Sequence, residues 1–180
     1  AVDSIEVGES DSLVSSLAVT QDISCFGGSD GRVLTNIQGG TAPLTYLWSN
    51  NNNTDSLSGV VAGSYQLTVT DARQCTDTLS VVLNEPTQLT STIDSSFNIS
   101  CNGLIDGYAS VSANGGTTPY TYLWNDPANS STAQINNLPP GAYTVTVTDA
   151  NQCTSTNSIV ISQAPVLSTS NISFIAVSCF

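Results

Sequence analysis

Apolar and polar residues alternate with a period of two along several short stretches of the chain. Gln and Thr stand between Tyr65, Leu67 and Val69, and the same alternation returns at 143–148 and 79–83. A period of two with polar residues on the other face is typical of an antiparallel strand that buries one side. No stretch shows the period of about 3.6 residues that marks an amphipathic helix. The pattern therefore predicts an all-β fold.

The alternating stretches belong to a repeat of about 78 residues, which occurs twice in full. Three pairs of motifs define it: SCFGGSDG (24–31) and SCNGLIDG (100–107), GGTAPLTYLW (39–48) and GGTTPYTYLW (115–124), GSYQLTVTDARQCT (63–76) and GAYTVTVTDANQCT (141–154). The spacing between partners is the same for the first two pairs and slightly longer for the last pair. The additional residues follow the Trp, and such a change in length marks a surface loop.

Short strands separated by Gly, Asn, Asp and Pro turns predict tandem Ig-like or fibronectin-III-like antiparallel β-sandwich repeats. Pro86 and Pro165 stand at the joints, where proline ends a strand and stiffens a short linker. The expected division has four parts: 1–10 as the tail strand of a preceding repeat, 11–86 as β-sandwich repeat 1, 87–165 as β-sandwich repeat 2, and 166–180 as the first strand of a following repeat.

Both full repeats follow the pattern SCxGxxDG…GGTxPYTYLW…GxYTVTVTDANxCT, with small departures such as Leu44 where Tyr is usual. This pattern resembles the SprB-type repeat of Bacteroidetes cell-surface adhesins over nearly the whole chain. The resemblance implies a very long secreted protein at the bacterial cell surface, with a role in attachment and gliding motility. Each repeat is then expected to contact mainly the neighbouring repeats of the same chain.

The composition excludes several functions. The chain has 2 Lys+Arg residues, both of them Arg, 14 Asp+Glu and no His, and its formal net charge is −12. Without His there is no Ser-His-Asp triad and no imidazole metal ligand, and without Lys there is no Schiff base. A chain with so negative a net charge cannot neutralise phosphates, which disfavours nucleic-acid binding. It has no apolar run of about 18 residues, which disfavours membrane insertion. We therefore expect no enzymatic activity and no cofactor.

Five cysteines occupy two positions of the repeat: Cys25, Cys101 and Cys179 at one, Cys75 and Cys153 at the other. In a secreted protein they are expected to form disulfides. If an even number of antiparallel strands separates two cysteines, both lie at the same end of the sandwich. The stretch between Trp48 and Tyr65 leaves little room for a fifth full strand, so four strands are expected between Cys25 and Cys75. We therefore expect Cys25–Cys75 and Cys101–Cys153 bonds within repeats, and a partner beyond the chain for Cys179. A Cys25–Cys153 bond between repeats and free thiols are the alternatives, and the lack of a C-x-x-C spacing disfavours zinc.

Trp48 and Trp124 have two interpretations. Exposed tryptophans serve as sugar-stacking platforms in carbohydrate-binding modules, whereas a Trp on this strand of an Ig-like sandwich fills the core. We expect both in the core, together with Tyr65 and Tyr143. The Leu138–Tyr143 run resembles the corner that precedes strand F in such folds.

Four aspartates recur at turns: Asp30, Asp71, Asp106 and Asp149. Paired carboxylates hydrolyse glycosides or bind calcium in other proteins. Each of these residues stands beside Gly or within a TDA turn, where Asp accepts hydrogen bonds from its own backbone, and no D-x-D-x-D loop is present. Turn formation is therefore expected, with calcium binding as the alternative.

Several Asp-Ser and Asp-Thr pairs precede Ile or Leu and resemble the O-glycosylation signal of Bacteroidetes. The candidate hydroxyls are those of Ser4, Ser12, Ser56 and Thr78. Chance occurrence in a chain rich in Ser and Thr is the competing explanation.

The sequence thus favours a structural and adhesive repeat segment of a long secreted cell-surface adhesin or filament. Single-file repeats and lateral self-association into a filament are both open, and surface glycans or other cells are the candidate external partners. A carbohydrate-binding accessory module array of a secreted hydrolase is the alternative function, and a calcium-dependent adhesion rod is a third. Exposure or burial of Trp48 and Trp124 separates the first two.

Overall fold

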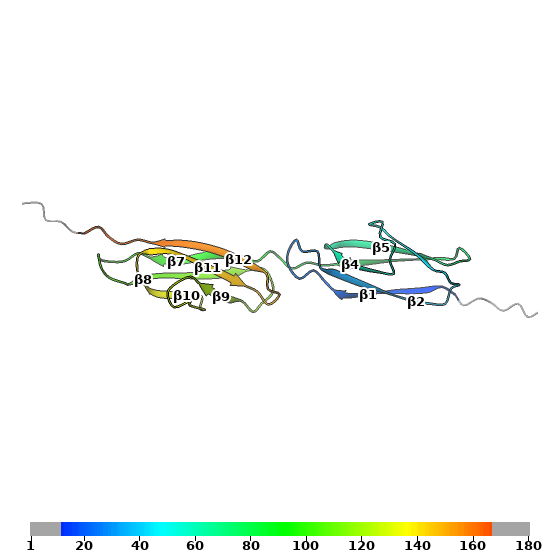
Figure 1. The fold of residues 1–180 in the computed structure, drawn as a ribbon, viewed down its shortest axis with the longest axis horizontal. Helices are drawn as coiled ribbons and strands as arrows, with labels where there is room; N and C mark the ends of the chain where they lie inside the picture. Colours follow the sequence, from blue (N-terminus) through cyan, green and yellow to red (C-terminus); the bar gives the residue numbers. More distant parts are fainter. Residues whose placement is uncertain (1–11, 167–180) are drawn as a thin grey trace, which may run out of the picture. The chain divides into compact units, whose positions relative to one another are not determined.

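The structure is a computed structural model, and it describes residues 12–166 of the 180-residue chain. All regular secondary structure in this range is β-strand (Figure 1), which confirms the all-β prediction. The strands are β1 (Val14–Gln21), β2 (Gly31–Gln38), β3 (Thr45–Trp48), β4 (Ser56–Val60), β5 (Gly63–Thr70), β6 (Thr76–Leu83), β7 (Thr90–Phe97), β8 (Gly107–Asn114), β9 (Thr121–Trp124), β10 (Gln134–Leu138), β11 (Gly141–Thr148) and β12 (Thr154–Ile161). The strand predicted at 1–10 lies outside the described residues, as does nearly all of the one predicted at 166–180.

The first repeat folds into two three-stranded antiparallel sheets. One sheet has the order β1-β2-β4 and the other has the order β3-β5-β6. The inner faces of both sheets contribute to a single core, and its buried residues are Val33, Trp48, Leu57, Tyr65, Leu67, Val69 and Leu83. Two antiparallel sheets around one apolar core form a β-sandwich.

The second repeat builds the same sandwich from β10-β8-β7 and β12-β11-β9. Its buried core residues are Ile99, Ala109, Val111, Trp124, Ile135, Leu138, Tyr143, Val145, Val147 and Ile161. Most of these stand at the positions that are buried in the first repeat. The predicted Ig-like or fibronectin-III-like sandwich is therefore present twice.

The alternation in the sequence is the inside–outside alternation of the central strands. In β5, Tyr65, Leu67 and Val69 are buried and Gln66 is exposed. β11 has the same burial pattern from Tyr143 onwards. Burying each large apolar side chain contributes about 1.5–3 kcal/mol, so these two strands supply much of the free energy that holds each sandwich together.

β3 and β4 each cover about half of the sandwich and run in the same direction. β3 pairs only with the second half of β5, where Trp48 lies opposite Leu67. β4 pairs only with the first half of β2, from Leu34 back to Gly31. The chain therefore crosses the sandwich from one end to the other once, a crossing that we call a traverse, in two short strands. It changes from one sheet to the other halfway, in the loop at 49–55. β9 and β10 repeat this arrangement.

Side-chain hydrogen bonds join the two sheets of each sandwich along one edge. Between β1 and β6, the backbone N–H of Ser15 donates to the Asp77 carboxylate at 2.8 Å, and the Ser15 hydroxyl donates to the same oxygen. Between β7 and β12, the hydroxyls of Ser91 and Ser155 lie 3.0 Å apart, and the Asn157 side chain donates to the Ser91 carbonyl at 2.9 Å. Different residues thus close the same edge in the two repeats.

The chain divides into two compact units whose limits differ from those of the sequence repeats. The first unit runs to Leu89 and includes two turns of the second repeat, Asn114–Pro119 and Asp149–Cys153. At Gly115, which has a φ of +75°, a Cβ atom would lie 2.0 Å from the Gln88 carbonyl oxygen. Only glycine combines this backbone conformation with so close an approach.

Candidate functional site

The four aromatic residues expected in the core are buried. Trp48 and Trp124 are each 1% exposed, and Tyr65 and Tyr143 are 8% and 5% exposed. Each indole N–H donates to a backbone carbonyl oxygen in the loop that follows, at 2.9 Å in both repeats. A tryptophan held in this way presents no ring face on which a sugar could stack.

The two tyrosines form corners of the kind found in Ig-like sandwiches. The hydroxyl of Tyr65 donates to the Val61 carbonyl at 2.9 Å, and that of Tyr143 donates to the Pro139 carbonyl at 2.8 Å. Burial, followed by the nearby Asp126 carboxylate, raises the pKa of the Tyr143 hydroxyl. The phenol therefore stays protonated to higher pH and keeps its hydrogen bond.

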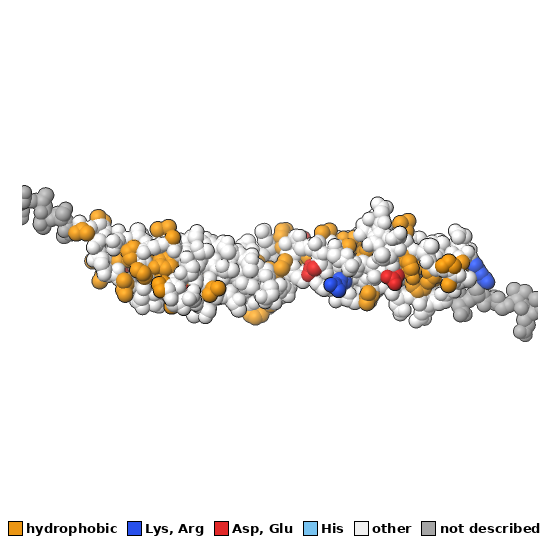
Figure 2. Space-filling model, in the orientation of Figure 1, with side chains coloured by type: hydrophobic (Ala, Val, Ile, Leu, Met, Phe, Trp, Pro, Cys, Tyr) orange, Lys and Arg blue, Asp and Glu red, His pale blue; other side chains and the backbone are white. Residues whose placement is uncertain are grey.

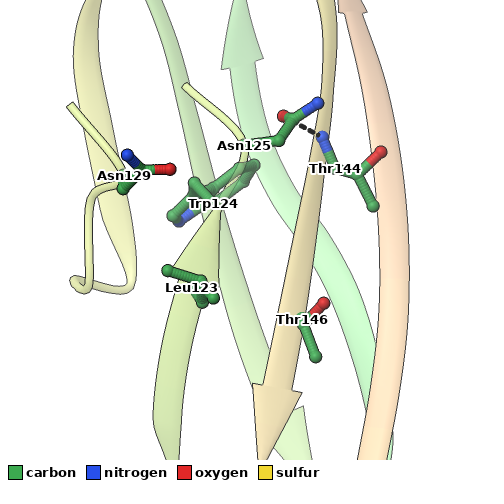
Figure 3. Close-up of a pocket in the computed structure, with 6 residues that line it drawn as sticks. All are labelled: Leu123, Trp124, Asn125, Asn129, Thr144 and Thr146. Carbon is green, nitrogen blue, oxygen red and sulfur yellow. Dashed lines mark hydrogen bonds between the residues drawn. The ribbon is translucent and has the colours of Figure 1, made fainter. Parts of the chain in front are cut away.

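A shallow hollow lies beside the Trp in each repeat. Its volume is about 220 Å³ beside Trp124 and about 210 Å³ beside Trp48. Pockets that enclose small ligands measure about 300–1,000 Å³. The side-chain oxygen of Asn125 accepts the backbone N–H of Thr144 at 2.7 Å and so already serves the sheet. Figure 3 shows the lining of the hollow in the second repeat: Leu123, Trp124, Asn125, Asn129, Thr144 and Thr146.

Asp71 organises the hairpin between β5 and β6. One carboxylate oxygen accepts the backbone N–H groups of Arg73 and Cys75 at 2.8 Å each, and the other accepts that of Thr41 at 3.0 Å. The bond from Thr41, and then those from Cys75 and Arg73, hold the pKa of the Asp71 carboxyl below its ordinary value. Asp149 accepts the three equivalent N–H groups in the second repeat at 2.9 Å each. Both carboxylates are therefore committed to their own backbone.

Asp30 and Asp106 organise the loop between the first two strands of each repeat. They accept the backbone N–H of Ser24 at 3.0 Å and of Ser100 at 3.1 Å. Hydrogen bonding by the serine side chains, and then by their backbone, lowers the pKa of both carboxyls. Over residues 12–166, no three side chains of His, Cys, Asp or Glu come together in a way that could hold a metal ion. Turn formation accounts for all four recurrent aspartates.

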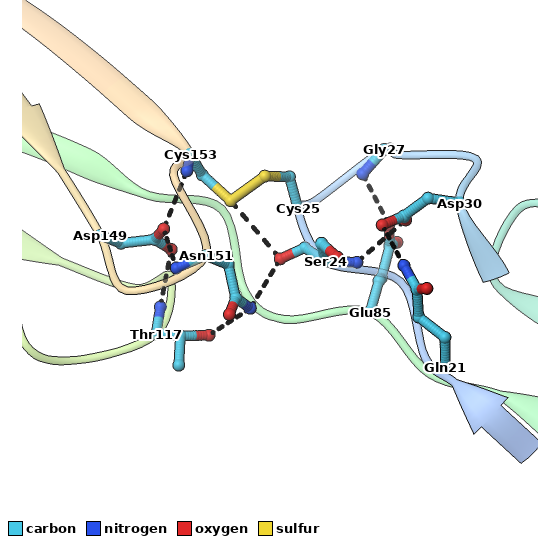
Figure 4. The surroundings of a disulfide bond; sticks show 10 residues. All are labelled: Gln21, Ser24, Cys25, Gly27, Asp30, Glu85, Thr117, Asp149, Asn151 and Cys153. Atoms are coloured by element: carbon cyan, nitrogen blue, oxygen red, sulfur yellow. Dashed lines mark hydrogen bonds between the residues drawn. A yellow bond between two sulfur atoms is a disulfide. The ribbon is translucent and has the colours of Figure 1, made fainter.

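Cys25 and Cys153 form a disulfide, with their Cα atoms 5.7 Å apart (Figure 4). Cys75 and Cys101 are exposed free thiols. The predicted pairs Cys25–Cys75 and Cys101–Cys153 are therefore wrong, and the alternative of a bond between successive repeats is correct. Cys179 lies outside the described residues.

The prediction failed because it counted strands instead of traverses of the sandwich. Four strands, β2 to β5, separate Cys25 from Cys75. Four full strands would return the chain to the pole at which it started. Because β3 and β4 share one traverse, only three traverses separate the two cysteines, and these residues lie at opposite poles.

Polar contacts accompany the disulfide within the first compact unit. The side-chain amide of Asn151 donates to the Ser24 carbonyl at 3.0 Å and to the Thr117 hydroxyl at 3.2 Å (Figure 4). Both bonded cysteines are half-buried. Asn151 and Cys153 both belong to the repeated TDANQCT motif, so the sequence pointed to these residues. It did not show that they contact the loop that carries Ser24 and Cys25.

The candidate glycosylation hydroxyls differ in their exposure. Ser12 and Thr78 are exposed, and Ser56 is half-buried, with its hydroxyl donating to the Asp55 carboxylate at 3.1 Å. Ser4 lies outside the described residues. Modification at these positions stays a prediction.

The face of the described residues shown in Figure 2 is mostly uncharged. On the face shown in Figure 2, side chains that are neither hydrophobic nor charged, together with backbone, cover most of the area. Leu47 and Leu123, which point away from the core, are 57% and 55% exposed. The described residues contain no helix with the length and hydrophobicity to cross a membrane.

The SprB repeat family model matches two segments of the chain, residues 17–53 and 94–129. The first segment extends from within β1 to the loop after β3, and the second extends from within β7 to the loop after β9. The family match therefore recurs with the sandwich, and the resemblance stated from the motifs is confirmed. A comparison with curated proteins found no match.

Three solved structures illustrate what the fold is similar to. The C-terminal 282-residue fragment of intimin, in complex with the intimin-binding domain of the translocated intimin receptor, is 16% identical with a TM-score of 0.44, over 84% of this chain and 64% of that one. The fibronectin(III)-like modules of Clostridium thermocellum CbhA are 9% identical with a TM-score of 0.33, over 87% and 99%. A tetra-tandem repeat from the extending region of a large adhesion protein is 15% identical with a TM-score of 0.30, over 85% and 50%. The chain thus spans about two thirds of the intimin fragment and half of the adhesion-protein repeat array.

Proposed function

We propose that the chain is a structural and adhesive repeat segment of a long secreted bacterial adhesin, displayed at the cell surface and serving attachment and gliding motility. The observation that supports this most is the coincidence of two SprB repeat matches with one sandwich built twice. Neighbouring repeats of the same chain are the first partners of each repeat. Lateral self-association into a filament, and contacts with surface glycans or other cells, are finer parts of the same proposal.

The use of the polar and aromatic side chains supports a non-catalytic role. The recurrent carboxylates of Asp71 and Asp149 accept three backbone N–H groups each. These two carboxylates are thus occupied in holding turns. A carbohydrate-binding array of a secreted hydrolase would need exposed aromatic rings, and Trp48 and Trp124 are each 1% exposed.

The surface location is tested with antibodies raised against the chain. They are expected to label intact cells of the source organism, and brief treatment of the cells with an external protease should remove the label. Label that appears only after the cells are permeabilised would contradict the proposal. Antibody absorbed beforehand with the purified chain is the control.

The adhesive role is tested with monovalent Fab fragments of the same antibodies. Fab added to cells is expected to reduce the number that attach to glass and the fraction that glide. Fab absorbed with the purified chain should leave both unchanged. Full attachment by cells whose surface is saturated with Fab would restrict the segment to a purely structural role.

A further inference from the structure

The bonded and the free cysteines are equivalent pairs. Cys101 stands one repeat after Cys25, and Cys153 stands one repeat after Cys75, at the same motif positions. The observed disulfide therefore joins the first cysteine of one repeat to the second cysteine of the next. The two exposed thiols are one cysteine of each kind, so they form an unused complementary pair.

The loops that carry Cys25 and Cys101 share two backbone hydrogen bonds. The Cys25 carbonyl accepts the N–H of Gly28 at 2.8 Å, and the Cys101 carbonyl accepts the N–H of Leu104 at 3.2 Å. In both loops the preceding serine donates to an aspartate in the turn. Cys101 is thus presented as Cys25 is, although no partner is bonded to it.

The loops that carry Cys75 and Cys153 also match. The N–H of Cys75 donates to the Asp71 carboxylate at 2.8 Å, and that of Cys153 donates to the Asp149 carboxylate at 2.9 Å. Each cysteine carbonyl accepts the N–H of its aspartate at 3.0 Å. A loop that already forms a disulfide in one repeat is therefore preformed in the other.

The contacts around the disulfide can also form at the unused pair. Asn151 donates to the Ser24 carbonyl beside the observed bond, and its counterpart in the first repeat is Arg73. A guanidinium has more N–H donors than an amide, so Arg73 can donate to the carbonyl of Ser100, the counterpart of Ser24. Asp106 in the same loop as Ser100 adds a charge of opposite sign.

We propose that Cys101 forms a disulfide with the second cysteine of the repeat that follows it, and Cys75 with the first cysteine of the repeat that precedes it, in the relation that Cys25 has to Cys153; two joined copies of the chain supply such neighbouring repeats for the test. The two thiols lose two protons and two electrons, and a sulfur–sulfur bond forms. Oxidised glutathione accepts the two electrons and the two protons, and its own disulfide is cleaved to give two molecules of glutathione. Each repeat would then be bonded both to the one before it and to the one after it. This inference does not depend on the proposed surface location, and either can fail without the other.

The test joins two copies in register. Leu13, Leu89 and Leu167 are equivalent positions, so residues 1–167 of one copy are followed directly by residues 14–180 of a second. Cys101 of the first copy and Cys75 of the second are then as far apart along the joined chain as Cys25 and Cys153 are within one copy, at a sequence separation of 128. The junction therefore reproduces the spacing of the bond that is observed.

The joined chain is refolded in a mixture of reduced and oxidised glutathione and mapped by mass spectrometry without reduction. The expected result is a Cys25–Cys153 bond within each copy and one Cys101–Cys75 bond across the junction. Alkylation of both junction cysteines while the Cys25–Cys153 bonds are complete would overturn the proposal. A Cys101→Ser change in the first copy should leave Cys75 of the second open to alkylation.

A linker control separates a built junction from mere proximity. About 12 Gly and Ser residues inserted at the junction keep the cysteines tethered at high effective concentration but remove the register. The yield of the Cys101–Cys75 bond is expected to fall several-fold, and an equal yield would overturn the proposal. Arg73→Glu in the second copy should slow formation of the bond several-fold, because it places a carboxylate against the Ser100 carbonyl and Asp106.

Discussion

The two repeats share a framework and differ in the loop where the chain changes sheets. In the first repeat, Asn52 holds this loop, since its side-chain oxygen accepts the N–H of Thr54 at 2.9 Å and its hydroxyl at 2.6 Å. In the second repeat, Asp126 does so by accepting the N–H of Ser130 at 2.7 Å and its hydroxyl at 2.9 Å. Asp126 is 7% exposed.

The difference shows which parts of the repeat set the fold. The buried Trp, the tyrosine corner and the aspartate of the hairpin recur with nearly the same distances. The loop changes in length and replaces a neutral amide with a carboxylate, yet its Trp remains in place. We infer that the shared residues set the stability of both repeats equally, and that Asp126 in the loop adds a pH-dependent contribution in the second repeat.

The largest expected effect comes from the core tryptophans. Trp48→Ala and Trp124→Ala should each destabilise their own repeat by about 3–5 kcal/mol, because a large buried side chain leaves a cavity. Calorimetry measures the loss, and fluorescence of the remaining Trp should show the other repeat unchanged. Leu123→Ala, at a side chain that is 55% exposed, is the control and should change stability by less than about 0.5 kcal/mol. Clearly unequal losses in the two repeats would break the comparison.

A smaller effect is expected at Gly115. Gly115→Ala combines a left-handed backbone with a Cβ atom 2.0 Å from the Gln88 carbonyl oxygen, so the backbone must move. Gly103, with a φ of +88°, has no atom within 4 Å of the added Cβ and is the matched control. Gly103→Ala should cost about 1–2 kcal/mol from conformational strain alone. Chemical denaturation should show a loss for Gly115→Ala that is at least about 1 kcal/mol larger. Equal losses would mean that the close approach to Gln88 contributes nothing.

The tyrosine corners come next. Tyr65→Phe and Tyr143→Phe each remove one hydrogen bond to a backbone carbonyl and keep the ring, so each should cost about 1 kcal/mol in free energy of unfolding. Tyr122→Phe is the control, because its hydroxyl makes no hydrogen bond among residues 12–166. A loss confined to one repeat would show that the corners are not equivalent.

The smallest effect is a difference in acid sensitivity. Burial acts to raise the pKa of Asp126, but hydrogen bonds from Ser130 and Ala128 outweigh it, and the pKa lies below the ordinary 3.8. As the pH falls, the unfolded chain takes up the proton first. The stabilisation is therefore complete above pH 3.8 and is lost as the pH falls through the lower folded value.

Asp126→Asn should flatten the decline of the melting temperature of the second repeat below about pH 4. In the first repeat the corresponding hydrogen bonds are accepted by the Asn52 amide, which does not titrate. Trp124 fluorescence in a Trp48→Phe background reports the second repeat alone. An unchanged pH profile in Asp126→Asn would show that this carboxylate does not set the acid response.

The core and the strands could be predicted because burial imposes a period of two that the sequence displays. Tyr65, Leu67 and Val69 are apolar since they face the core, and the repetition at Tyr143 confirms the pattern by a second instance. The tyrosine corner could be predicted because a Gly and a Tyr stand at a fixed spacing that the turn requires.

The disulfide and the role of Asp126 could not be predicted. A period of two shows which face of a strand is buried, but not how far the strand extends across the sandwich. The short strands β3 and β4 therefore looked like two traverses, and this misplaced Cys75 relative to Cys25. Asp126 has no counterpart among the recurrent aspartates, so comparison of the repeats gave no reason to select it.

The Cys25–Cys153 bond also determines how the chain responds to a pulling force. A force applied at the two ends passes through the two sulfur atoms and bypasses the backbone between them, which covers a sequence separation of 128. That stretch cannot lengthen under load while the bond is intact. After reduction, unfolding of the sandwiches under load would release on the order of 400 Å of additional contour length. The oxidised chain is thus a short covalent link under tension, and the reduced chain is a long extensible tether.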